Sequence, residues 1–411
     1  MKGFSPKHIL ILTILLFWTL PLGCGGGSQD NNRSVAAPPQ VIATAGPNVQ
    51  TIYVNGGPTS SIPPANGGYV YPNAAFTSVT VCAPGTSNCQ TIDGVLVDTG
   101  SFGLRLLSSV LPSALYTTPN TGSNLSECVI FGDGSYVWGP VQTFDVKIAD
   151  ESASSVPVHV IDSNFYASSI PSTCSSGGGP EEDDLLSLGA NGILGIGPFQ
   201  YDCGNDCVNV SSFPTGYPYY DCSSSSGCQA TSVNLPQQVQ NPVALFSTDN
   251  NGVIIELPAV SGPTASITGS MVFGIGTQSN NGLSSATMLT LNQYASIDTT
   301  YKGTVLPYSF IDSGSNAYFF PDTRIPQDNY GWYIPTTTLD LTATNTGNNG
   351  MSNNVSFSVG NADNMPYDAV LNTLAGYIPA SYGYFDWGLP FFYGRNVYVA
   401  MSGGPGPYWA Y

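Results

Sequence analysis

The stretch Val95-Leu96-Val97-Asp98-Thr99-Gly100-Ser101 decides the fold, because an apolar strand end runs directly into Asp-Thr-Gly-Ser. Its counterpart in the second half of the chain is Ser309-Phe310-Ile311-Asp312-Ser313-Gly314-Ser315. Each stretch is later followed by a hydrophobic glycine motif, Asn191–Gly197 (NGILGIG) and Asp386–Phe392 (DWGLPFF). Two matching halves predict two lobes related by an approximate two-fold axis, with one aspartate from each lobe brought face to face.

The composition indicates an all-β protein with a few short helices. The 411 residues include 47 Gly and 32 Pro, and only 8% are charged, which leaves few side chains for the wet faces of long helices. Short alternating apolar runs between turn residues predict strands, as in Phe76–Val81, Phe144–Ile148 and Val397–Met401. Residues 174–182 and 200–234 are typical of long surface loops held by disulfides.

Charge and histidine content exclude several classes of function. The 26 acidic residues outnumber the 8 basic ones, which argues against nucleic acid and anionic membranes as partners. The acidity is consistent either with plain solubility or with tolerance of mildly acidic surroundings. His8 and His159 are the two histidines, and His159 lies in an apolar run that predicts a strand. We therefore expect no metal site and no cofactor, and carboxylates must carry any acid–base chemistry.

The paired stretches have the residue types that such chemistry needs. Two neighbouring carboxylates cannot both ionise, so Asp98 and Asp312 would share one proton, one acting as general base toward a water and the other as acid. Around them, glycines would let the backbone approach, inner hydroxyls would lock the two loops together, and outer hydroxyls would bond the outer carboxylate oxygens. These supporting residues are Gly100, Gly314, Thr99, Ser313, Ser101 and Ser315.

Together these motifs resemble the pepsin-like aspartic peptidases over most of residues 69–402. Phe131-Gly132-Asp133-Gly134-Ser135 is similar to the flap hairpin of that family, and Asn241–Ser247, Gly269–Gly276 and Trp387–Val399 are similar to three of its later segments. The resemblance implies a bilobal double barrel that cleaves extended peptides. The layout also resembles a bacterial lipoprotein-like family that carries only a domain-of-unknown-function label.

The chain departs from the peptidase pattern near the flap. Phe131 stands where the family has Tyr, and Arg105 stands where many members have the Trp that partners this Tyr. We expect a cation–π contact between Arg105 and Phe131 to replace the lost hydrogen bond. Phe102 replaces a small residue, and Asp386-Trp387 replaces an aliphatic pair, which predicts unusual packing behind Asp312.

The N-terminus predicts export. Residues 1–23 have a basic start, a short apolar run and small residues, as in a signal peptide. The end at Cys24 resembles a lipobox, although Pro21 departs from it, so that lipidation of Cys24 and ordinary secretion both stay open. Residues 24–66 are expected to be a flexible tether, followed by lobes at 67–235 and 236–411.

Eight further cysteines form an even set, as expected for disulfides in an exported chain. Proximity favours four pairs: Cys82–Cys89, Cys128–Cys174, Cys203–Cys207 and Cys222–Cys228. A zinc site is the competing interpretation, although no spacing matches the usual CxxC arrangement.

Three functions are consistent with these features. The first is an active, monomeric endopeptidase of the bacterial cell envelope, lipid-anchored, with peptides or unfolded proteins as substrates. The second is a binding or structural lipoprotein that has the fold without the chemistry. The third, carbohydrate binding, rests only on the many Tyr and Trp residues and the acidic balance.

Overall fold

The computed structural model describes residues 42–411 except 120–123, 210–217, 224–226, 367 and 403–405. The predicted signal peptide and the Cys24 lipidation site lie outside the described residues. Strands dominate the described part, with a single four-residue α-helix, α1 (Leu185–Leu188), and several short 3-10 turns. The predicted all-β class is therefore confirmed. Across the residues described, no helix is long and apolar enough to cross a membrane.

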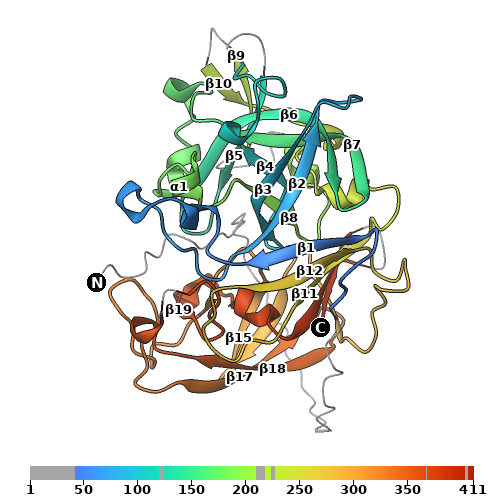
Figure 1. Ribbon diagram of the computed structural model, residues 1–411. Coiled ribbons are helices and arrows are strands. Elements are labelled where there is room, and N and C mark those ends of the chain that lie inside the picture. Colours follow the sequence, from blue (N-terminus) through green and yellow to red (C-terminus); the bar gives the residue numbers. More distant parts are fainter. Residues whose placement is uncertain (1–41, 120–123, 210–217, 224–226, 367, 403–405) are drawn as a thin grey trace.

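The strands build two lobes, which Figure 1 shows one above the other. Those of the first lobe are β2 (Ala75–Cys82), β3 (Cys89–Asp98), β4 (Phe102–Leu107), β5 (Asn124–Ile130), β6 (Tyr136–Ile148), β7 (Glu151–Ile161), β8 (Gly192–Ile196), β9 (Tyr219–Ser223) and β10 (Gly227–Ala230). Those of the second are β11 (Gly252–Leu257), β12 (Ile267–Phe273), β13 (Met288–Thr290), β14 (Ile297–Tyr301), β15 (Thr304–Ile311), β16 (Tyr318–Phe320), β17 (Leu339–Thr346), β18 (Ser352–Val359), β19 (Ala375–Tyr377), β20 (Asp386–Trp387), β21 (Arg395–Ala400) and β22 (Tyr408–Ala410).

A strand from the predicted tether joins the lobes. β1 (Val49–Val54) pairs with β2 of the first lobe and with β12 of the second, and it lies between the lobes in Figure 1. Ile52 and Val54 alternate onto the buried face and are fully buried. The folded part of the chain thus begins before residue 67. The sequence predicted a tether here because the apolar alternation of β1 is short and lies within a stretch whose overall composition is typical of a linker.

The two halves share the same strand arrangement around their paired stretches. In the first lobe β3 runs parallel to β8, which is antiparallel to β4, and β4 is parallel to β7. In the second lobe β15 runs parallel to β20, which is antiparallel to β16, and β16 is parallel to β19. This correspondence confirms the approximate two-fold symmetry. It also makes Ile193, opposite Leu96, the equivalent of Asp386, opposite Phe310.

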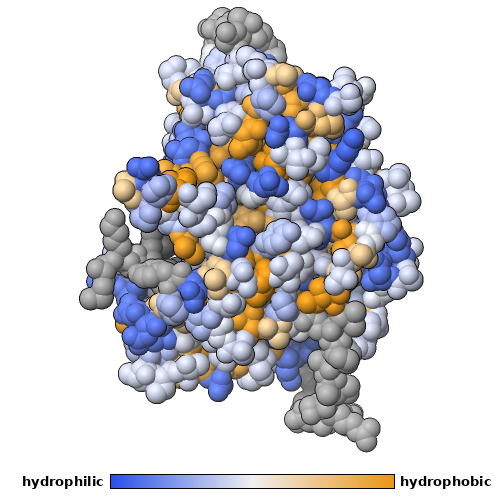
Figure 2. Space-filling view, in the orientation of Figure 1, coloured by the Kyte–Doolittle hydropathy of each residue, from blue (hydrophilic) through white to orange (hydrophobic). Residues whose placement is uncertain are grey.

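The loop predicted at residues 200–234 contains a hairpin. β9 pairs with β10 and also with β5, so the hairpin widens the sheet of the first lobe. On the face shown in Figure 2, hydrophobic residues form small patches among hydrophilic ones. The largest apolar cluster lies inside, where it runs through the first lobe, the β1–β12 region and the second lobe.

Candidate active site

The two aspartates meet where the lobes join. Asp98 ends β3 and Asp312 directly follows β15, and their exposed fractions are 1% and 0%. The hydroxyl of Ser101 donates to Oδ2 of Asp98, and the hydroxyl of Ser315 donates to Oδ2 of Asp312 at 2.8 Å. The outer oxygens of both carboxyl groups therefore have the hydroxyl donors expected from the sequence.

Glycines hold the inner oxygens and set the separation of the carboxyls. The backbone N–H of Gly100 donates to Oδ1 of Asp98 at 2.8 Å, and that of Gly314 donates to Oδ1 of Asp312 at 2.7 Å. A Cβ added to Gly100 would lie 2.7 Å from Cγ of Asp312, and one added to Gly314 would lie 2.6 Å from Oδ1 of Asp98. Each glycine thus abuts the aspartate of the other lobe, which brings the two carboxyl groups together.

A reciprocal network locks the two loops. Oγ1 of Thr99 donates to the carbonyl of Ile311 at 2.9 Å and accepts from the N–H of Ser313 at 2.9 Å. Symmetrically, Oγ of Ser313 donates to the carbonyl of Val97 at 2.7 Å and accepts from the N–H of Thr99 at 3.1 Å. All four groups are buried, so the network is fully satisfied without water and fixes the loops relative to each other.

Burial raises the pKa of both aspartates, and the charge of Asp98 raises the pKa of Asp312 further. Burial raises the pKa of Asp98, opposed by hydrogen bonds from Ser101, Asp312 and Gly100. Burial, followed by the charges of Asp98 and Asp386, raises the pKa of Asp312 well above its ordinary value. The pair therefore retains a proton that an exposed carboxyl would lose, and the two carboxyls titrate as one unit.

The predicted flap is a tight turn between β5 and β6. The N–H of Phe131 donates to the carbonyl of Ser135 at 2.8 Å, and the carboxylate of Asp133 accepts from the N–H of Ser135 at 2.9 Å. Gly134 has φ of 87°, a conformation that favours glycine. Phe131 is 3% exposed and belongs to an apolar cluster that also contains Tyr71.

A second segment covers this turn. The N–H of Gly179 donates to the carbonyl of Gly134 at 2.9 Å, and the N–H of Tyr136 donates to the carbonyl of Pro180 at 3.0 Å. The disulfide Cys128–Cys174 joins β5 to the start of the same segment. The flap turn is therefore fastened at its tip as well as at its base.

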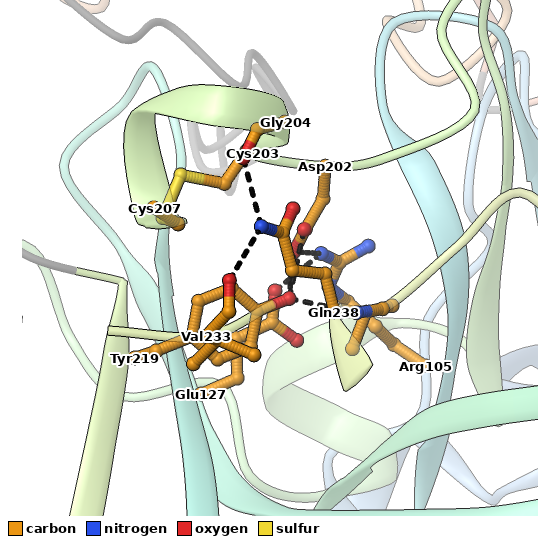
Figure 3. Close-up of a disulfide and its surroundings, with 10 residues drawn as sticks. Arg105, Glu127, Asp202, Cys203, Gly204, Cys207, Tyr219, Val233 and Gln238 are labelled. Carbon is orange, nitrogen blue, oxygen red and sulfur yellow. Dashed lines mark hydrogen bonds and ion pairs between the residues drawn. A yellow bond between two sulfur atoms is a disulfide. The ribbon is translucent and has the colours of Figure 1, made fainter. Parts of the chain in front are cut away.

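Arg105 does not form the expected cation–π contact with Phe131. Its Nη2 lies 2.8 Å from Oε1 of Glu127 and 3.4 Å from Oδ2 of Asp202, in a cluster that is nearly inaccessible to solvent (Figure 3). Where the chain is described, the cation–π contacts are Lys302 over Tyr301 and Arg395 over Phe391. A buried guanidinium is stabilised far more by a carboxylate than by a ring face, and Glu127 supplies one from β5.

Two further groups complete this cluster. Nδ1 of His159 lies 3.0 Å from Oε2 of Glu127, and the hydroxyl of Tyr219 donates to Asp202 at 2.7 Å. Burial raises the pKa of Glu127, but the charge of Arg105, the hydrogen bonds with Asp202 and His159 and the charge of His159 together outweigh burial and hold this pKa below its ordinary value. Burial, then the charge of Glu127, raises the pKa of Asp202 well above its ordinary value. The cluster ties β4, β5 and β7 to the segment before the Cys203–Cys207 disulfide.

All four expected disulfides are present in the structure: Cys82–Cys89, Cys128–Cys174, Cys203–Cys207 and Cys222–Cys228. Cys203–Cys207 follows Asp202 directly and is seen beside it in Figure 3. The last three pairs lie in or next to the widened sheet that carries the flap, since Cys128 is on β5 and Cys222 and Cys228 pair across β9 and β10.

Comparison with known proteins supports the fold assignment. The family model described as "Protein of unknown function (DUF3443)" matches residues 44–411. The chain belongs to this family. The fold is similar to that of an aspartic proteinase from Irpex lacteus, with 16% identity, a TM-score of 0.53, and coverage of 88% of this chain and 96% of that one. No curated protein matches the chain.

In this DUF3443 member, two residues near the aspartates were not assigned a role from the sequence. Tyr71 is buried, and burial, followed by the charges of nearby groups that include Asp133 and Asp98, raises its pKa well above its ordinary value. Nothing in its local sequence distinguishes it from a core tyrosine. Asp386 lies behind Asp312, and its replacement of an aliphatic residue was the signal that could have identified it.

Proposed function

We propose that the protein is an aspartic endopeptidase of the cell envelope, in which Asp98 and Asp312 activate a water to hydrolyse peptide bonds. One observation supports this proposal above others, namely the complete reciprocal network of Thr99 and Ser313 beneath the two carboxyls. A dyad without catalytic use would have no need for a lock of this precision around a pair that repel when both are ionised.

The mechanism follows from the protonation of the pair. The ionised aspartate of the pair takes a proton from the water as the water oxygen bonds to the peptide carbonyl carbon, while the protonated aspartate gives its proton to the carbonyl oxygen. The tetrahedral intermediate then collapses as the first aspartate returns a proton to the amide nitrogen and the second recovers one from a hydroxyl. The C–N bond breaks, and the dyad regains its single proton.

A second candidate is a binding protein that has the fold without turnover. The covered flap favours it, because Gly134 is hydrogen-bonded to Gly179 and the segment that covers it is tied to β5 by a disulfide. A substrate would have to displace this contact. Phe131 also lacks the hydroxyl that the peptidase pattern has at its position.

Incubation of the purified, oxidised chain with an unfolded protein, from about pH 3 to 7, separates the two candidates. Pepstatin-sensitive cleavage that is lost in Asp98→Asn and Asp312→Asn, and kept in the exposed-site control Asp363→Asn, is the expected result. A folded wild-type protein that cleaves nothing across this range would contradict the peptidase proposal and leave the binding protein.

Export and anchoring are also proposals. The basic and apolar N-terminal stretch and Cys24 support a lipid-anchored precursor, and the four disulfides support an oxidising compartment. In cells that process lipoproteins, labelled fatty acid should enter the wild-type chain and not Cys24→Ser. Equal labelling of the two would contradict the anchor.

A further inference from the structure

A buried asparagine ahead of β2 is hydrogen-bonded to the second lobe through its side chain. Asn73 is 0% exposed and lies between β1 and β2. Its Nδ2 donates to the carbonyl of Asn316 at 2.9 Å and to that of Leu371 at 2.6 Å. Its Oδ1 accepts from the N–H of Leu371 at 2.6 Å and from the hydroxyl of Tyr393 at 2.7 Å. The segment that leads into the first lobe is thus anchored in the second.

The side-chain amide of Asn73 is satisfied on both sides. A carboxamide has two donor hydrogens and an oxygen that accepts two hydrogen bonds, and the bonds described above use all of them. The reversed amide would put its oxygen against two carbonyls, so the orientation is fixed. The backbone of Asn73 has φ of 51°, a left-handed conformation that asparagine adopts more readily than most residues with a side chain. Backbone and amide therefore both favour asparagine at this position.

One of these bonds ends at the loop that carries Asp312. Asn316 directly follows Ser315, whose hydroxyl donates to Oδ2 of Asp312 at 2.8 Å. On the other side, Asn73 lies two residues before the start of β2, and β2 pairs with β3, which ends at Asp98. Asn73 therefore connects the two aspartate-bearing stretches at a place apart from the reciprocal network beneath the carboxyls.

The first lobe has a corresponding bond, made by a different residue. Phe102 follows the outer serine of the first loop, and Asn316 follows that of the second. The carbonyl of Phe102 accepts from Nη1 of Arg105 at 2.7 Å, within the same lobe. The carbonyl of Asn316 accepts from Asn73, which comes from the other lobe. Because unrelated side chains make this bond in the two lobes, we attribute to it a role in supporting the loop.

We propose that Asn73 is a positioning residue for Asp312: its amide fixes the exit of the Asp312 loop, so that the direction in which Asp312 faces Asp98 depends on the seating of this first-lobe segment in the second lobe. The bonds to Leu371 and Tyr393 hold the amide in place, and the bond to Asn316 transmits that position to the loop. The effect on catalysis rests on the proposed peptidase function, whereas the effect on the loop does not.

The first test measures the loop without activity. Asn73→Gly keeps the left-handed backbone and removes the amide. Asn48→Ala is the matched control, because Asn48 is also 0% exposed and donates to the second lobe, at the carbonyl of Phe273 and not at the Asp312 loop. Amide hydrogen exchange is followed in two peptides, residues 309–317 and 95–103, which contain the two loops.

In Asn73→Gly, the exchange rate of residues 309–317 should rise relative to that of residues 95–103, because only the Asp312 loop loses a support. Asn48→Ala should leave this ratio as in the wild type, since any loss of stability there affects both loops. An unchanged ratio in Asn73→Gly, or an equal rise in the control, would overturn the proposal.

A second variant covers a failure to fold. Asn73→Asp keeps the size of the side chain but has at most one donor for the two carbonyls, and it replaces Asn73→Gly in the exchange test if that variant does not fold. If neither variant folds, the proposal is overturned, because Asn73 is then a requirement of the whole fold and not of the loop.

The next test separates kcat from KM. A displacement of a reacting group by about 1 Å lowers the rate by about 100-fold. At a temperature where it is folded, Asn73→Gly should therefore lose kcat on that order with KM unchanged, and Asn48→Ala should keep its kcat. A wild-type kcat in Asn73→Gly would overturn the positioning role and leave the peptidase proposal intact. If the wild type cleaves nothing, the peptidase proposal fails, and hydrogen exchange alone decides whether Asn73 supports the loop.

Discussion

Gly100 and Gly314 determine how near the two aspartates can approach each other. Each lies against the carboxyl group of the opposite lobe, where any side chain would collide with the carboxylate. The hydroxyls around them adjust the direction of hydrogen bonds, but the glycines fix the distance. A substitution at either glycine therefore tests the dyad geometry without removing a titrating group.

Gly314→Ala should abolish peptide cleavage and destabilise the fold. The new methyl group would lie 2.6 Å from Oδ1 of Asp98, and relief of this contact has to move one loop, at a cost of about 1–3 kcal/mol. Gly262→Ala is the matched control, because a Cβ there meets nothing within 4 Å. Thermal unfolding and peptide hydrolysis measure the two effects. Full activity in Gly314→Ala would contradict the face-to-face arrangement of the carboxyls.

Arg105→Met should destabilise the protein strongly. The change leaves Glu127 buried without its cation, at a cost of about 3–5 kcal/mol. Lys147→Met, on the exposed side of β6, serves as the control. Denaturant unfolding measures the difference. A stability equal to that of the control would show that Glu127 is not ionised in its buried cluster.

At the scale of elements, the flap hairpin is an internal part of its sheet. β5 has β6 on one side and β9 on the other, and the segment that begins at Cys174 covers the turn. A hairpin with neighbours on both sides opens at a higher free energy than one that projects freely. We expect any access of substrate to depend on release of the covering segment rather than on bending of the hairpin.

The double variant Cys128→Ala/Cys174→Ala should release that segment. Amide exchange of Phe131–Ser135 should become faster, and stability should fall by about 4 kcal/mol, since the disulfide closes a loop with a sequence separation of 46. The control Cys82→Ala/Cys89→Ala opens a loop with a separation of 7 and should cost about 2 kcal/mol, with exchange in the flap unchanged. Equal exchange of the flap in both variants would contradict the fastening.

At the scale of the whole molecule, buried carboxyls make stability depend on pH. Burial raises the pKa of Asp202, Asp312 and Asp386, so the native state retains protons that the unfolded chain releases near pH 4. Their contribution to stability is complete below that pH and is lost as the pH rises. Burial lowers the pKa of His159, so the native state opposes its protonation, and this effect destabilises only as the pH falls below about 6.5.

Asp202, Asp312 and Asp386 lower the stability as the pH rises, whereas His159 alone acts in the opposite direction. The free energy of unfolding should therefore fall from about pH 4.5 to 8, by about 1.4 kcal/mol per pH unit for each proton retained. Calorimetric unfolding at constant ionic strength measures this slope. A melting temperature that is constant or rises over this range would contradict the protonated state of the buried carboxyls. A stability that falls as the pH rises would favour the interpretation of the acidic composition as tolerance of acidic surroundings.

The parts of the site that the sequence predicted are those that depend on short local stretches. Asp98, Thr99 and their counterparts lie in short stretches whose chemistry depends on the stretch itself, and the close cysteines have few geometric alternatives. By contrast, the partners of Arg105 come from β5 and from the segment before Cys203, and no local pattern specifies such pairings. β1 was assigned to a linker for the same reason, since its partner strand β12 lies in the other lobe.

The position of β1 has a consequence for the order of events during synthesis. Asn48 donates to the carbonyl of Phe273, 225 residues further along the chain, so β1, the first strand of the described residues, must wait for the whole first lobe and for the β11 and β12 strands of the second. Such distant pairing closes slowly, and the edge of β1 that pairs with β12 stays open in the meantime. The nascent first lobe should therefore need a holding chaperone until β12 has been translated.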